Sequence, residues 1–206
     1  MFSMENEMND LDFILNFEEN KIKGIWLSGT EGEGEFVRYW ENGNLREHSH
    51  WENGKRHGEY KDYRENGQLM RHAFYENGKL NGKFKMYHNN GQLGLYCFYK
   101  NGKLNSECKV YHENGQLGIY CFYKNDKRHG EYESYTSRGR FHKQCFYKND
   151  KRHGEYKLYY ENGQLWLQSF YKNGKRHGER KCYDHNGQLR EHSLYKNGKK
   201  IKDLME

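Results

Sequence analysis

One short motif in this sequence has the residue types for chemistry: Lys-Arg-His-Gly-Glu, present in four copies. The copies occupy residues 55–59, 127–131, 151–155 and 175–179. A histidine beside a carboxylate can act as a general acid and base, and several histidines together can hold a metal ion. Both kinds of site need different groups that converge on one point, whereas this chain presents the same groups at many points. The motif therefore predicts a row of charged turn residues, and neither a catalytic nor a metal site.

Three of the five cysteines recur at one interval, as Cys97, Cys121 and Cys145. On equivalent strands they would lie two strands, or roughly 10 Å, apart. Bonded cysteines need Cα atoms within about 7 Å, so we expect small packing residues in place of disulfides. Cys108 and Cys182 are expected to stand alone.

The apolar runs last only a few residues, so we expect neither a signal peptide nor a transmembrane segment. The predicted location is the cytoplasm or a virus particle and not the secreted fraction, with the thiols kept reduced.

The composition excludes a thick hydrophobic core. Hydrophobic residues make up 33% of the chain against 31% charged residues, and the mean hydropathy is −1.35. So polar a composition is typical of disorder, but aromatic residues reach 17% and disordered chains are poor in them. There is no proline to remove a backbone donor from a strand. We therefore expect an all-β fold with many half-exposed aromatic side chains.

An internal repeat determines the predicted architecture. A turn dipeptide recurs at intervals that alternate between 11 and 13 residues, which defines a 24-residue unit. Most copies are Asn-Gly, which favours type I′ hairpin turns because both central residues need positive φ. Short strands between such turns predict an elongated single-layer antiparallel β-meander. The second residues of the dipeptides are Gly43, Gly54, Gly67, Gly78, Gly91, Gly102, Gly115, Asp126, Gly139, Asp150, Gly163, Gly174, Gly187 and Gly198.

The chain divides into two predicted parts. Residues 23–206 form the β-repeat domain, with about seven units and a degenerate first half-unit. Residues 1–22 do not follow the repeat and carry an amphipathic helical stripe. We expect a short helical cap over the first strand, with binding of a partner by this helix as the alternative. The stripe consists of Met4, Met8, Leu11 and Leu15.

The formal net charge of +6 is unevenly distributed. Residues 1–20 carry six acidic residues and no lysine or arginine, so the rest of the chain carries +12. Such a basic body can contact nucleic acid, anionic lipid or an acidic protein. It can equally be a solvated surface with a docked acidic tail.

Two-residue turns would place Glu65 opposite Gln68 and sort the side chains onto two faces. One face is expected to carry Tyr63, Tyr87, Tyr111, Tyr135, Tyr159 and Tyr183 with Phe74, Phe98, Phe122, Phe146 and Phe170. The other face is expected to carry Leu69, Leu93, Leu117, Phe141, Leu165 and Leu189, a small-residue column of Ser49, Ala73, Cys97, Cys121, Cys145, Ser169 and Ser193, and an aromatic column of Trp51, Tyr75, Tyr99, Tyr123, Tyr147, Tyr171 and Tyr195.

In the same register the motif arginines face aromatic residues, and cation–π pairing would hold them in structural roles. The expected pairs are Arg56 with Trp51, Arg128 with Tyr123, Arg152 with Tyr147, and Arg176 with Tyr171.

Two stretches resemble a known repeat family. Asn53-Gly-Lys-Arg-His-Gly-Glu-Tyr60 resembles a MORN repeat, and Tyr63-Arg-Glu-Asn-Gly-Gln-Leu69 resembles the MORN-repeat variant. That variant occurs in bacterial YwqK-type antitoxin-like proteins and in many giant-virus proteins. The resemblance covers about residues 24–200 and implies one β-hairpin per repeat, a scaffold or adaptor role, and no enzymatic activity or cofactor. The chain lacks the paired Gly-x-Gly of the standard repeat after most turns, so the lipid binding proposed for that family carries over poorly.

We therefore expect a non-enzymatic scaffold protein that presents a ribbed surface to a partner protein, in a viral particle or another assembly. The alternatives are peripheral binding to an anionic membrane or nucleic acid, and antitoxin-like binding of a partner. A second copy of the chain is a further expected partner, through the exposed ends of the sheet. The candidate interaction residues are Arg56, His57, Arg128, His129, Arg152, His153, Arg176, His177, Tyr111, Tyr135, Tyr159, Phe98, Phe122 and Phe146.

Overall fold

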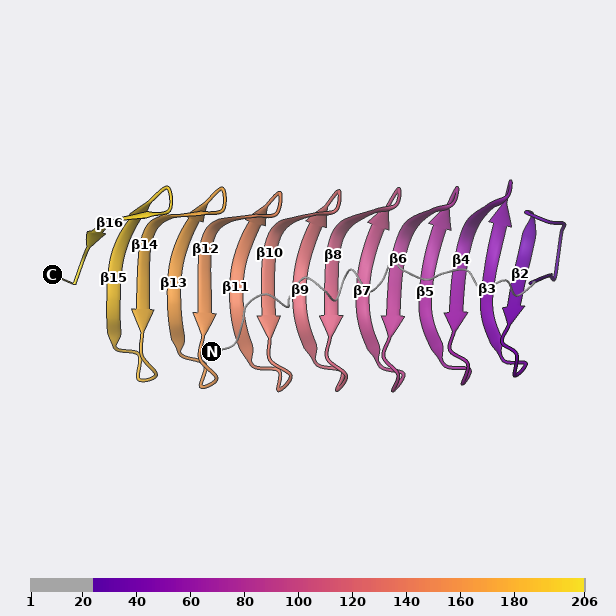
Figure 1. Ribbon diagram of the computed structural model, residues 1–206, viewed down its shortest axis with the longest axis horizontal. Helices are drawn as coiled ribbons and strands as arrows, with labels where there is room; N and C mark the ends of the chain where they lie inside the picture. Colours follow the sequence, from indigo (N-terminus) through magenta and orange to yellow (C-terminus); the bar gives the residue numbers. More distant parts are fainter. Residues whose placement is uncertain (1–23, 206) are drawn as a thin grey trace.

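A computed structural model of the chain describes residues 24–205, which form one sheet of sixteen antiparallel strands (Figure 1). Each strand pairs with its neighbours in sequence, which confirms the predicted all-β single-layer meander. The predicted helical cap falls in residues 1–22, outside the described residues. The described residues include no apolar helix of bilayer-spanning length.

The strands are β1 (Ile25–Trp26), β2 (Gly34–Tyr39), β3 (Leu45–Glu52), β4 (Lys55–Tyr63), β5 (Leu69–Glu76), β6 (Lys79–Tyr87), β7 (Leu93–Lys100), β8 (Lys103–Tyr111), β9 (Leu117–Lys124), β10 (Lys127–Tyr135), β11 (Phe141–Lys148), β12 (Lys151–Tyr159), β13 (Leu165–Lys172), β14 (Lys175–Tyr183), β15 (Leu189–Lys196) and β16 (Lys199–Asp203).

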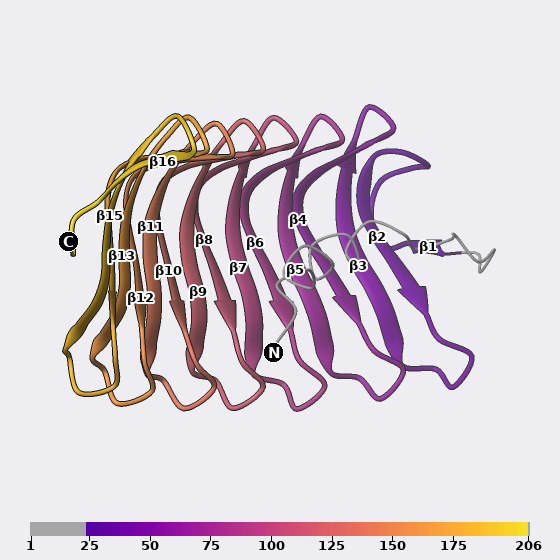
Figure 2. The same ribbon diagram turned by 60° about the vertical axis from the view of Figure 1, so that its left-hand side comes forward.

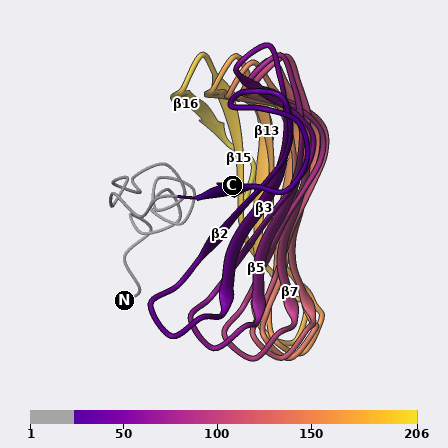
Figure 3. The same ribbon diagram turned by 90° about the vertical axis from the view of Figure 1, so that its right-hand side faces the viewer.

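The turns form two parallel rows at the two edges of a bent sheet. Figure 2 shows both rows, and Figure 3 shows end-on how the strands curve. From β3 onward, each odd-numbered strand leads into a short turn and each even-numbered strand into a longer one. We call these rows the tight-turn edge and the wide-turn edge; in Figure 1 they lie at the top and the bottom.

The tight turns have the predicted type I′ form. Asn53 and Gly54 both have positive φ, at 51° and 69°, and the flanking residues of β3 and β4 pair directly across the turn. Successive turns are joined by backbone hydrogen bonds such as Gly78 N–H to Arg56 O, at 2.8 Å. Where aspartate replaces glycine, its carboxylate adds a bond: Asp126 Oδ1 accepts from the backbone N–H of Leu104 at 2.8 Å. This bond offsets the strain of positive φ in a non-glycine residue.

The wide turns do not have the predicted two-residue form. Gly67 N–H donates to Arg64 O, and Arg64 N–H donates to Gln68 O, at 2.9 and 2.8 Å. This is a type I turn followed by a glycine with positive φ, so Arg64, and not Glu65, lies opposite Gln68. Asn66 Oδ1 accepts the N–H of Gln68 at 3.0 Å, and this local bond selects the longer loop over type I′.

A β-bulge after each wide turn also places one column of side chains on the face opposite the predicted one. Pairing between β10 and β11 shifts by one residue at Ser134/Tyr135, so that Tyr135 lies opposite Phe141. The ring of Phe141 packs 5.3 Å from that of Tyr135 and 5.1 Å from that of Tyr159. The same shift occurs at Asp62/Tyr63, where Tyr63 pairs with Leu69. The column headed by Leu69 therefore shares the tyrosine face, and its predicted place beside the small residues was wrong.

The core of the sheet is a single row of side chains that crosses it near the middle of the strands. We call this the central row and the face that carries it the packed face. In β3 to β15 the odd-numbered strands contribute small residues and most even-numbered strands large ones, so neighbouring strands interlock. Ring contacts such as Tyr60 to Tyr75, 5.6 Å, confirm that the aromatic column flanks the small-residue column. The central row is Phe36, Ser49, Tyr60, Ala73, Phe84, Cys97, Cys108, Cys121, Tyr132, Cys145, Tyr156, Ser169, Arg180 and Ser193.

A second row on the packed face changes character along the sheet. It is charged at β2 to β5, apolar at β6 to β9, and mixed beyond. We call it the flanking row. Its members are Arg38, Glu47, Asp62, Arg71, Met86, Leu95, Val110, Ile119, Ser134, Lys143, Leu158, Leu167, Cys182 and Glu191.

Cys108 does not stand alone, contrary to the sequence-based prediction. It lies directly opposite Cys97 on the adjacent strand, with 4.2 Å between their Cα atoms, and the two form a disulfide. The spacing argument compared equivalent strands, whereas these cysteines come from neighbouring strands of one hairpin. Cys121, Cys145 and Cys182 have free thiols.

The residue four positions after the tight turn has an unusual backbone conformation in the even-numbered strands from β4 to β14. Its φ is positive at all six of these positions, and glycine occupies five of them, whereas at the sixth Ser106 has φ of 97°. A non-glycine residue there is strained by about 1–3 kcal/mol.

We predict that Ser106→Gly stabilises the protein by about 1 kcal/mol, because relief of strain exceeds the added entropy of the unfolded chain. Urea unfolding should show this as a higher midpoint at an unchanged slope. The reciprocal change, Gly130→Ser at φ of 109°, should destabilise by a similar amount. An unchanged or lower midpoint for Ser106→Gly would contradict the prediction.

Candidate functional site

The four copies of the Lys-Arg-His-Gly-Glu motif open strands β4, β10, β12 and β14 at the tight-turn edge. The arginine of each copy lies opposite an aromatic residue in the predicted register, for example Arg56 opposite Trp51, and the guanidinium is 5.3 Å from that ring. In all four copies the guanidinium reaches forward, past the glycine bulge, to the tyrosine of the next hairpin. For Arg128, Arg152 and Arg176 this forward tyrosine takes the place of the directly opposite ring that the sequence predicted as the cation–π partner. Arg128 lies 4.3 Å from the Tyr147 ring and Arg176 lies 5.5 Å from the Tyr195 ring. The arginines therefore join successive hairpins.

The histidines of the motif lie at separate turns. His57 Nδ1 is 3.4 Å from Glu52 Oε2, and His129 Nδ1 is 3.3 Å from Asn149 Oδ1. His57 and His129 thus each contact a polar group near their own turn, whereas the buried Nδ1 atoms of His153 and His177 have no hydrogen-bond partner among the residues that the structure describes. Within residues 24–205, no three histidine, cysteine or acidic residues are grouped so that they could hold a metal ion.

In three of the four copies the glutamate of the motif pairs with a lysine two residues later on the same strand, whereas Glu131 accepts a hydrogen bond from Gln144. Glu59 Oε2 lies 2.8 Å from Lys61 Nζ, and Glu155 and Lys157 repeat the arrangement at 2.8 Å. The hydrogen bond from Lys61 lowers the pKa of the Glu59 carboxyl. Both partners are therefore charged at neutral pH, and the arginine and the glutamate of the motif make structural or charge-pairing contacts.

The free thiol of Cys121 is not suited to act as a nucleophile. Burial raises the pKa of this thiol to about 11, so it is protonated at neutral pH. A reactive cysteine needs a lowered pKa and access to solvent.

The face opposite the packed face carries aromatic rows separated by charged pairs, and we call it the ribbed face. Its phenylalanines lie opposite glutamate or lysine on the preceding strand, as Phe146 does opposite Glu131. Phe146 and Phe170 are 40% and 37% exposed, which is high for rings of this size. Tyr135 donates to Glu133 Oε2 at 2.7 Å, and burial with this bond raises its pKa to about 12.

The predicted interaction residues are divided between the two faces. Phe98, Phe122, Phe146, Tyr111, Tyr135 and Tyr159 belong to the ribbed face, together with the histidines of the motif. The motif arginines lie on the packed face, half-buried among aromatic rings. They therefore do not belong to the same surface as the phenylalanines and tyrosines.

The tight-turn edge concentrates exposed positive charge in the second half of the sheet. Five consecutive tight turns place two exposed lysines directly opposite each other, whereas the first two place glutamate opposite lysine. Like charges directly opposite are unfavourable in a sheet. We call this array the lysine edge. Its pairs are Lys100 and Lys103, Lys124 and Lys127, Lys148 and Lys151, Lys172 and Lys175, and Lys196 and Lys199.

The wide-turn edge carries a hydrogen-bond ladder that sequence reasoning missed. In five of the seven wide turns the first residue reaches forward to the carbonyl oxygen 23 residues later, as Trp40 Nε1–H does to Tyr63 O at 2.9 Å. Arg64, His88, His112 and Tyr160 make the same contact, at 2.7, 2.8, 3.1 and 2.8 Å. The signal available in the sequence is a polar or planar residue just after the strand-ending tyrosine of these units.

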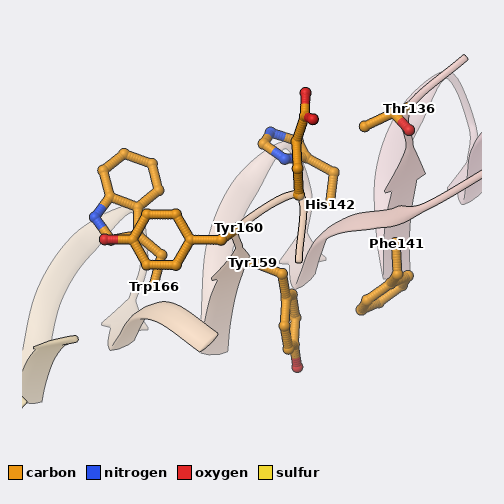
Figure 4. Close-up of a pocket in the computed structure, with 7 residues that line it drawn as sticks. Thr136, Phe141, His142, Tyr159, Tyr160 and Trp166 are labelled. Atoms are coloured by element: carbon orange, nitrogen blue, oxygen red, sulfur yellow. The ribbon is translucent and has the colours of Figure 1, made fainter. Parts of the chain in front are cut away.

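The ladder is interrupted at Thr136, whose side chain is too short to reach Tyr159 O. A cavity of about 300 Å³ lies there. Figure 4 shows Tyr160 and Trp166 together on one side of it and Thr136 and Phe141 on the other, with Tyr159 between them. The remaining lining residues are His142 and Glu161.

The sequence matches one family model, described as MORN repeat variant, in six segments that together cover more than half of the chain. The segments are residues 32–53, 56–77, 80–93, 104–125, 152–173 and 176–197. No curated protein is detectably similar to the chain. The unmatched stretch 126–151 contains Thr136 and the single Arg-Gly turn, the unit that departs most from the others. Five of the six segments each span one strand pair, from β2 with β3 to β14 with β15. The chain therefore belongs to the MORN repeat variant family.

Proposed function

We propose that the chain is a non-enzymatic repeat protein that binds a partner protein through its ribbed face. The observation that carries this proposal is the exposure of two large aromatic rings on the ribbed face, Phe146 and Phe170. Aromatic side chains that are already held by a rigid sheet lose little freedom on binding and commonly anchor interfaces.

The charges on the ribbed face favour a protein over a polyanion as its partner. Glu59 with Lys61, Glu107 with Lys109, and Glu179 with Lys181 place an acid beside a lysine at 2.6 to 2.8 Å. Paired charges leave little net attraction for phosphate, whereas an aromatic row with a polar rim resembles a protein interface.

The test is capture from lysate with three tagged baits of the full chain: wild type, Phe146→Ser/Phe170→Ser, and Lys148→Glu/Lys172→Glu. We expect wild type and the lysine variant to retain one protein partner at high salt. The phenylalanine variant should bind that purified partner at least about tenfold more weakly, the effect of one hot-spot residue. Equal binding by the phenylalanine variant would refute the proposal, and circular dichroism should show an unchanged fold.

The identity of the retained partner distinguishes the finer roles that we propose. A toxin-like enzyme would specify antitoxin-like binding, and a protein of a viral particle or other assembly would specify a scaffold. Light scattering on the purified chain tests whether a second copy is the partner.

The lysine edge favours a second candidate function, peripheral binding to an anionic membrane or nucleic acid. Its like-charged pairs are unfavourable in the free protein and would be relieved by a bound polyanion. In this case binding to anionic vesicles or single-stranded DNA should collapse between about 50 and 200 mM salt. It should be lost in the lysine variant and kept in the phenylalanine variant, the reverse of the outcome above.

A further inference from the structure

The cavity at Thr136 is best understood by comparison with the other units of the same chain. In the equivalent space of a neighbouring unit, the ring of His112 lies across the turn and contacts Tyr135 O at 3.1 Å. In the following unit the phenol of Tyr160 fills this space and donates to Tyr183 O at 2.8 Å. In these two units the equivalent space therefore holds a planar side chain with a hydrogen-bond donor. Thr136 supplies no such side chain, which leaves the cavity.

The walls of the cavity fit such a group. Phe141, Tyr160 and Trp166 offer ring surfaces, and Tyr159, whose carbonyl oxygen is the equivalent acceptor of the ladder, also lines the space. The Tyr160 and Trp166 rings lie 5.8 Å apart, and Trp166 is 40% exposed, so the site is open to an incoming group.

The charges around the cavity favour a neutral ring over a cation as its occupant. Glu161 is the acidic residue of the lining, and its carboxylate already lies 3.8 Å from Arg138 and 4.0 Å from Arg140. Arg140 also donates to Glu161 O at 2.8 Å. With two arginines beside one carboxylate, the neighbourhood disfavours an arginine or lysine as the occupant.

We propose that this cavity binds an aromatic side chain with a hydrogen-bond donor, of the tyrosine type, from a partner polypeptide. The incoming ring would pack against Phe141 and Trp166 and donate to Tyr159 O, which restores the missing rung of the ladder. This site lies on the wide-turn edge and uses neither Phe146 nor Phe170, the rings on which the proposed function rests, so either proposal can fail without the other.

The test uses N-acetyltyrosinamide as the probe and N-acetylphenylalaninamide, which lacks only the hydroxyl, as its matched control. Binding to the full chain is followed by NMR, through the indole N–H of Trp166 and the backbone amide of Thr136. We expect saturable shifts with the tyrosine probe and roughly tenfold weaker binding of the phenylalanine probe, the effect of one neutral hydrogen bond. Absence of saturable shifts, or equal binding of the two probes, would overturn the proposal.

Two variants copy units that already exist in the chain. Thr136→His/His142→Gly reproduces the His112 and Gly118 arrangement, in which the glycine leaves room for the ring, and should abolish binding. His142→Gly alone keeps the cavity open and should still bind the probe. Binding that persists in the double variant would place the probe elsewhere and refute the site.

Discussion

Replacing Arg71 by leucine is expected to destabilise the sheet by about 3 kcal/mol at neutral pH, because it leaves a buried carboxylate without its cation. Arg71 Nη2 lies 2.5 Å from Asp62 Oδ2 and also donates to the hydroxyl of Tyr60 at 3.0 Å. The Asp62 side chain is only 11% exposed. Urea unfolding of wild type and variant at neutral pH measures the effect.

The loss should depend on pH in a defined direction. Burial already raises the pKa of the Asp62 carboxyl, against the opposing effect of Arg71. Without the guanidinium that pKa rises further, while the unfolded state keeps its ordinary value of about 3.9. The folded variant then binds its proton more tightly than the unfolded chain, so its stability falls as pH rises between the two pKa values. The destabilisation should be smallest near pH 4 and largest at neutral pH.

The chain contains its own control for this prediction. One unit later in the flanking row the same two positions hold Met86 and Leu95, which pack without charge. The double variant Asp62→Met/Arg71→Leu copies that pair and should recover most of the lost stability, since replacing a buried ion pair by apolar residues of similar size is often neutral. If the double variant is no more stable than Arg71→Leu, the loss does not come from the unpaired carboxylate.

Replacing Phe84 by alanine is the second large effect, with an expected loss of about 3–4 kcal/mol. Phe84 is 2% exposed, lies opposite Ala73 and Cys97 in the central row, and packs against Tyr99 with ring centroids 5.5 Å apart. Its small neighbours cannot expand into the space, so the variant loses transfer free energy and gains a cavity. The free energy of unfolding in urea measures the loss.

Phe146→Ala is the matched control for Phe84→Ala, because it removes the same side chain from the other face. Phe146 is 40% exposed, so its removal should change stability by less than about 1 kcal/mol. Equal losses from the two variants would mean that the packed and ribbed faces do not differ as described. The ring of Phe146 is also proposed to bind a partner. Its removal should therefore weaken partner binding with little change in the free energy of unfolding.

The Lys-Arg-His-Gly-Glu motif, whose residue types could do chemistry, serves instead to hold the repeats of the sheet together. Its arginine packs on a ring of the next hairpin, its glycine takes the positive φ of a bulge, and in three of the four copies its glutamate pairs with a lysine two residues later. Arg128, Gly130 and the pair of Glu155 with Lys157 are examples. MORN repeat proteins are generally non-enzymatic, and this use of the motif agrees with that.

The sequence by itself determined the architecture, because the repeat is encoded in short-range chemistry. Alternating Asn-Gly intervals predicted the meander, and the type I′ geometry at Asn53 and Gly54 follows from local φ preferences alone. The small-residue column and its aromatic neighbours followed from the two-residue period of strands. These features depend on residues within one hairpin, which a single sequence displays directly.

Only the tertiary structure decided the features that depend on contacts between hairpins or on competition between local alternatives. The same Asn-Gly dipeptide forms a longer loop at Asn66, where its side chain binds the N–H of Gln68, and the resulting bulge moved Leu69 to the other face. The neighbouring positions of Cys97 and Cys108, and the ladder that Thr136 interrupts, arise across adjacent strands or units. Register between strands is set by the geometry of every turn before it, and one added residue exchanges the faces.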